Sequence, residues 1–127
     1  MLLVLKLWST IRIMHESAAA LTLNNGAKWK ADASTNTNVV ALMDVINAAA
    51  PTTVEEYHHT GNGIQESLNK MISECQMQGE DHEALHHWLE PLLEMNKNLL
   101  GSQTVEEANK IFGSERYQIN LYPQYFE

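Results

Sequence analysis

Residues 52–75, TTVEEYHHTGNGIQESLNKMISEC, decide the fold. Small or apolar residues recur in this stretch three and four positions apart: Val54, Tyr57, Gly61, Ile64, Leu68, Met71 and Cys75. Such spacing is typical of a helix that buries one seam of side chains. Two overlapping Thr-x-x-Glu capping boxes within residues 52–56 predict where the helix begins. We expect Gly79 to cap its end and to reverse the chain.

A shorter helix is predicted upstream, from about Val39 to Ala49, because apolar residues recur there at helical spacing. One of residues 36–38 is expected to be its N-cap, since Asn and Thr accept hydrogen bonds from the first turn. Before the helix we expect a loop. It includes a turn at Asn25-Gly26 and a short extended piece whose Trp29 indole faces inward.

Two further helices are predicted downstream. The first should run from Asp81, as its cap, to Gly101, with a kink at Pro91, because proline removes a backbone hydrogen bond. The second begins with the capping box at Thr104 and is expected to continue past Gly113. Both stretches carry one apolar face, so each should pack against the rest of the chain.

Four amphipathic helices with short connections indicate an all-α protein, namely an antiparallel up-and-down four-helix bundle with an extra N-terminal segment. Residues 21–127 are expected to form this single helical-bundle domain. The aromatic end of the chain should dock on the bundle, since exposed aromatic surface is unfavourable. The residues concerned are Tyr122, Tyr125 and Phe126.

Charge and cysteine content restrict the classes of function. The chain of 127 residues holds 16 acidic and 8 basic residues, a formal charge of −8. Nucleic-acid binding needs a basic face, so this acidic balance argues against it. Cys75 is the only cysteine, which excludes an intramolecular disulfide.

Residues 1–20 differ from the remainder in being apolar and mildly basic. They end in Ala18-Ala19-Ala20, which offers a small-residue cleavage site like that of a secretory signal peptide. Lys6 and Arg12 interrupt the apolar run, so no stable membrane span is expected. The segment is interpreted either as an atypical export signal or as an N-terminal amphipathic segment packed on the domain.

Residues 75–88, CQMQGEDHEALHHW, are the stretch that suggests chemistry. If the chain reverses at Gly79, four soft or basic side chains come close together: Cys75, Met77, His82 and His86. His82 and His86 share one helix face, and sulfur with imidazole suits copper, or zinc if Met77 stays out. The alternative is a purely structural corner, because a free cysteine is often buried in a core. We predict no catalytic residues and therefore expect that the protein is not an enzyme.

Three segments resemble a group of small, mostly exported bacterial helical proteins with no assigned activity: LNNGAKWK at residues 23–30, ISECQMQGEDHEALHHWLEPL at residues 72–92, and YPQYFE at residues 122–127. These correspond to an LNNGxKW, CxMxGxxHxxLH and YFE pattern. The resemblance implies export to the periplasm, with the cytoplasm as the alternative. It singles out these motif positions: Cys75, Met77, Gly79, His82, Leu85 and His86.

The functional hypothesis is therefore an exported helical-bundle protein that binds copper or zinc at the Cys/Met/His corner. The alternative is a metal-free structural or interaction module, which would bind a protein partner or a second copy of the chain.

Overall fold

The computed structural model describes residues 21–127, and the expectations for residues 1–20 lie outside this range. The described part contains four long helices and one single-turn helix: α2 Ala33–Ala48, α3 Val54–Glu74, α4 Gly79–Leu100, α5 Val105–Asn120 and α6 Tyr122–Tyr125. Extended pairing within residues 21–127 is limited to isolated bridges. The prediction of an all-α protein is confirmed. No helix in the described part is long and apolar enough to cross a membrane.

The capping box predicted at Thr104 forms. Of the two overlapping boxes predicted for α3, the one at Thr53 forms, whereas Thr52 donates to Glu56 and not to Glu55. Thr53 Oγ1 accepts a hydrogen bond from the Glu56 amide at 3.1 Å, and the Glu56 carboxylate accepts one from the Thr52 amide at 2.7 Å. At α5, Thr104 Oγ1 accepts from the Glu107 amide at 3.1 Å. These bonds satisfy amides that the first helical turn leaves without partners.

The predicted start of α2 was wrong. The helix begins at Ala33, and its N-cap is Asp32, whose carboxylate accepts a hydrogen bond from the Thr35 amide at 2.9 Å. Several of the polar residues that resembled a loop are helical with side chains bound to distant parts of the protein: Ser34 and Asn38 bind Glu74, and Asn36 binds Tyr122. Thus Asn38 is buried and its amide donates to the Glu74 carboxylate at 3.0 Å.

The predicted boundary between the second and third helices was also wrong. The second helix, α3, ends before Cys75, and residues 75–78 are extended or irregular. Gly79 is not a C-terminal cap but the first residue of α4, with a φ of +72° that favours glycine. Asp81 is not the N-cap, which is Gln78. The Asp81 carboxylate instead accepts a hydrogen bond from the Lys30 amide at 3.0 Å.

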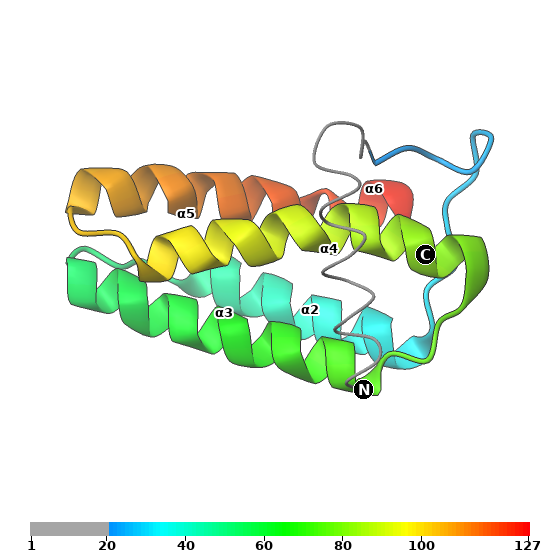
Figure 1. Cartoon of the computed structure of the whole chain (residues 1–127), viewed down its shortest axis with the longest axis horizontal. Coiled ribbons are helices and arrows are strands. Elements are labelled where there is room, and N and C mark those ends of the chain that lie inside the picture. Colours follow the sequence, from blue (N-terminus) through cyan, green and yellow to red (C-terminus); the bar gives the residue numbers. More distant parts are fainter. Residues whose placement is uncertain (1–20) are drawn as a thin grey trace.

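The long helices lie side by side, with α3 packed on α2 and α4, and α5 packed on α4 and α2 (Figure 1). Their buried faces enclose one hydrophobic core with Trp88 among its fully buried side chains. Helices α3 and α4 approach each other closely at Gly61. A Cβ at this position would lie only 2.9 Å from Leu100 Cδ2 of α4. The Gly61 carbonyl accepts a hydrogen bond from the Asn96 amide at 3.0 Å. Pro91 lies inside α4, and Gly113 inside α5.

The C-terminal tail docks on the body, as predicted. The Trp29 amide donates to the Tyr125 carbonyl at 2.8 Å, and the Glu127 amide donates back to the Trp29 carbonyl at 2.9 Å. Tyr122 stacks on Phe126 with ring centroids 4.7 Å apart, and both residues are buried. The segment around Trp29 and the C-terminal residues are therefore held together beside the first turn of α4, where Asp81 binds the Lys30 amide (Figure 1).

Candidate functional site

The connection from α3 to α4 brings Cys75 against two histidines of α4. Cys75 Sγ lies 3.9 Å from Nδ1 of His82, near the long limit for a hydrogen bond with sulfur. Nε2 of His82 lies 3.0 Å from Nε2 of His86, one helical turn later. Figure 1 shows the start of α4, where the chain returns from α3. The sulfur and the two rings thus form a continuous row of contacts.

Glu90 extends the row by one more helical turn. Its Oε2 lies 3.4 Å from Nδ1 of His86, and both residues are buried. The spacing of four residues between His86 and Glu90 places them on one face of α4. Together, Cys75, His82, His86 and Glu90 are called the corner cluster below.

One arrangement of protons suits every link of the corner cluster. The Cys75 thiol donates to Nδ1 of His82, Nε2–H of His82 donates to Nε2 of His86, and Nδ1 of His86 carries the proton that faces Glu90. Both imidazoles are then neutral. Burial lowers the pKa of His82, and the opposing effect of Asp32 and Glu83 is smaller. This direction favours the neutral ring.

Asp32 fixes the backbone that carries the sulfur. While one carboxylate oxygen caps α2, the other accepts a hydrogen bond from the Gln76 amide at 2.9 Å. Partial burial alone would raise the pKa of Asp32, but hydrogen bonds from Thr35, Gln76 and Ser34 outweigh it and lower the pKa. An ionised Asp32 therefore ties the start of α2 to the residue that follows Cys75.

Three of the four predicted ligands meet in the corner cluster, but they do not surround one point. Cys75 and His86 contact opposite nitrogens of the His82 ring. Met77 is partly buried against the hydrophobic core. Within residues 21–127, no group of three or more His, Cys, Asp or Glu side chains is arranged so that it could hold a metal ion. The predicted four-ligand set stays a prediction.

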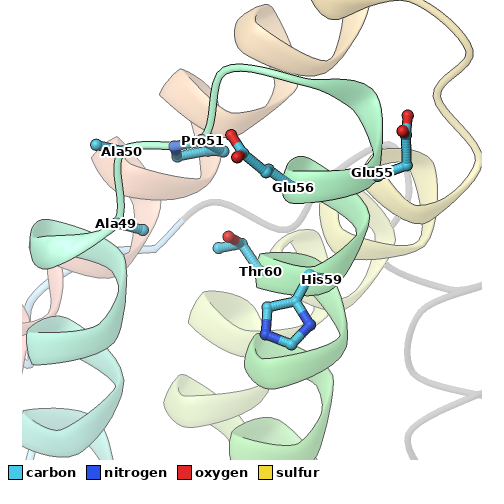
Figure 2. A pocket seen from close by; sticks show the side chains of 7 residues that line it. All are labelled: Ala49, Ala50, Pro51, Glu55, Glu56, His59 and Thr60. Atoms are coloured by element: carbon cyan, nitrogen blue, oxygen red, sulfur yellow. The ribbon is translucent and has the colours of Figure 1, made fainter.

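A shallow hollow lies elsewhere, at the connection between α2 and α3. It has a volume of about 360 Å³ and is lined by Ala49, Ala50, Pro51, Glu55, Glu56, His59 and Thr60 (Figure 2). Glu56 is already engaged in capping α3. The hollow is open, and its location at the start of α3 separates it from Cys75 at the end of that helix.

Sequence reasoning missed a buried carboxyl in α5. Glu115 is fully buried, and neither carboxyl oxygen has a hydrogen-bond partner among the described residues. Burial raises its pKa to about 8. The helical spacing of Ala108, Phe112, Glu115 and Ile119 could have revealed it, because all four share the buried face of α5.

Comparison with known proteins gives no match: no family model fits the chain, and no curated protein and no solved structure is significantly similar to it. The resemblance to small exported helical proteins therefore stays a prediction, and the function has to be argued from the corner cluster.

Proposed function

We propose that this protein binds a transition-metal ion, zinc or copper, at the corner cluster. The supporting observation is the contact between His82 and His86, whose Nε2 atoms are 3.0 Å apart. Two imidazole nitrogens on one tetrahedral zinc, each about 2.0–2.1 Å from the metal, are about 3.3–3.4 Å apart. To chelate an ion, the pair therefore needs to open by a few tenths of an ångström and to tilt so that both lone pairs point at the ion.

The surroundings of the histidine pair also suit a metal site. Glu90 faces the other nitrogen of His86, in the position of the carboxylates that commonly orient ligating histidines. Cys75 adds a sulfur beside His82. Asp32 and the Gln76 amide hold the connection in place, so the sulfur is positioned before any ion arrives.

The scaffold in this proposal is an antiparallel up-and-down four-helix bundle. Short connections join consecutive long helices, and neighbouring helices in the chain pack against each other (Figure 1). Such a bundle presents side chains of one helix to those of the next. Export to the periplasm and a non-enzymatic role are part of the same proposal. Export is testable by fractionation of cells that express the full chain.

The test of metal binding is calorimetric titration of the purified full chain with Zn²⁺, and with Cu⁺ under anaerobic conditions. We expect one ion per chain for the wild type and at least tenfold weaker binding for His82→Ala. His59→Ala is the matched control, because this exposed histidine lies near the other end of α3. The absence of any saturable binding to the wild type would rule the proposal out.

A second candidate, a metal-free interaction module, is favoured by the outer face of α2. Val40 is 58% exposed and Val45 is 40% exposed, and Asp44 is the only charged residue of the helix. Apolar side chains exposed in this way can mark a binding surface. Sedimentation velocity of the wild type and of Val40→Lys distinguishes self-association: a monomeric wild type would argue against a second copy as the partner.

A further inference from the structure

The contacts of the corner cluster identify individual donor atoms. We propose that the ion is bound by Nε2 of His82 and Nε2 of His86, while Cys75 and Glu90 remain outside the coordination sphere and hold Nδ1 of each ring. This inference rests on the proposed function, because it specifies the ligands and the class of metal at the same site. It also changes the set predicted from sequence, in which Cys75 was a direct ligand.

The orientation of the His82 ring limits where one ion can bind. Cys75 Sγ contacts Nδ1 of this ring, and His86 contacts Nε2. The lone pairs of the two imidazole nitrogens diverge, so one ion cannot be bound by the sulfur and by both Nε2 atoms while the ring keeps this orientation. The ion has to lie either between the two histidines or between His82 and Cys75.

Packing holds the His86 ring in its present orientation. His86 is fully buried, and its ring packs edge to face with His82 at a centroid distance of 4.6 Å and an interplanar angle of 83°. Flipping the fully buried ring of His86 would disturb this contact inside a packed interior. Binding between the two Nε2 atoms requires a small separation and a tilt that points both lone pairs at the ion, but it does not require either ring to flip.

Each Nδ1 atom faces a group that can accept a hydrogen bond from it once the ion is bound. Histidines that bind metal through one nitrogen usually donate the other N–H to a neighbouring group, which fixes the ring. Nδ1 of His86 faces Glu90 Oε2 at 3.4 Å, and Nδ1 of His82 faces Cys75 Sγ at 3.9 Å. When the ion occupies the Nε2 positions, the proton of His82 must reside on Nδ1, where the sulfur can accept it.

The ligand set determines the class of metal. Two imidazole nitrogens without a thiolate suit borderline divalent ions such as Zn²⁺, Cu²⁺ or Ni²⁺, whereas Cu⁺ favours sulfur. Two protein ligands leave further coordination positions, which water or a small anion would fill. The site is thus expected to prefer Zn²⁺ or Cu²⁺ to Cu⁺.

The experiment is an anaerobic titration of the full chain with Co²⁺, a spectroscopic substitute for Zn²⁺, followed by absorption. We expect visible bands of bound Co²⁺ without a thiolate-to-metal charge-transfer band. Cys75→Ser should bind within about threefold of the wild type. His82→Ala, a change at a partly exposed position, should weaken binding at least tenfold, and His59→Ala should leave it unchanged.

Glu90 is a positioning residue in this scheme, so its test needs a readout besides folding. Glu90→Gln should weaken Co²⁺ binding by about 10–100-fold, while the thermal midpoint of the metal-free chain changes little. If Glu90→Gln also markedly lowered the thermal midpoint of the metal-free chain, the loss of affinity would reflect damaged folding, and the positioning role of Glu90 would be overturned.

The outcomes separate this inference from the proposed function. A charge-transfer band in the wild type, together with loss of binding in Cys75→Ser, would overturn the inference and keep the metal site. No saturable binding of Co²⁺, Zn²⁺ or copper to the wild type would overturn both. Binding unaffected by His82→Ala would place the ion outside the corner cluster and overturn both as well.

Discussion

Replacing Glu115 by Gln should stabilise the protein and flatten its pH dependence. The carboxyl is fully buried without a hydrogen-bond partner in the described part of the chain, and burial raises its pKa from 4.5 to about 8. Below pH 4.5 both folded and unfolded states carry the proton. Between pH 4.5 and 8 only the folded state keeps it, so the free energy of unfolding falls as the pH rises.

The size of the effect follows from the shift in pKa. Each pH unit in this window changes the free energy of unfolding by about 1.4 kcal/mol, so Glu115 lowers stability by about 3 kcal/mol at pH 7 and by about 5 kcal/mol above pH 8. Gln keeps the shape of the side chain but does not ionise. The stability gained by Glu115→Gln should therefore grow with pH and level off above pH 8.

The assay is urea unfolding followed by circular dichroism at pH 5, 6, 7 and 8. The difference between Glu115→Gln and the wild type should increase by more than 2 kcal/mol from pH 5 to pH 7, at about 1.4 kcal/mol per unit. Glu106→Gln, an exposed site on the same helix, is the matched control and should show no such trend. A pH-independent difference between Glu115→Gln and the wild type would refute the reasoning.

Two further predictions concern close packing and capping. Gly61→Ala should be less stable than Gly63→Ala by about 1–3 kcal/mol, because a Cβ at Gly61 meets Leu100 whereas one at Gly63 meets nothing within 4 Å; equal thermal midpoints would count against the tight contact. Asp32→Ala should cost about 1–2 kcal/mol and should selectively remove hydrogen-exchange protection of the Gln76 amide, since Asp32 caps α2 and binds that amide. The control here is Asp44→Ala, an exposed change within the same helix, and unaltered exchange at Gln76 in Asp32→Ala would contradict the anchoring role.

The sequence correctly predicted those features of the fold that depend on residues a few positions apart, namely helical spacing and capping. The seam from Val54 to Met71 and the capping boxes at Thr53 and Thr104 lie where the structure has them, because spacing and capping involve residues within a few positions. The start of α2 was missed because Asn38 looks like a loop residue. Only its distant partner, Glu74, makes a helical position favourable.

The candidate site was predictable only in part, for the same reason. The spacing of His82 and His86 places them on one face of a helix, and the structure joins them to Cys75. The neighbour that each histidine nitrogen faces depends on side-chain rotamers and on packing between helices. Short sequence patterns do not determine either of these. Only the structure shows that Glu90 lies close to His86. In the sequence, Glu90 looks like any other carboxylate of an acidic chain.

The pairing of Trp29 with Tyr125 and Glu127 has a consequence for how the protein is made. A ribosome synthesises the Trp29 side of this pairing early, but its partners are among the last residues of the described chain to be translated. The bridge beside the corner cluster can therefore close only after the four long helices have been synthesised. Folding of this end of the molecule is therefore expected to be completed late.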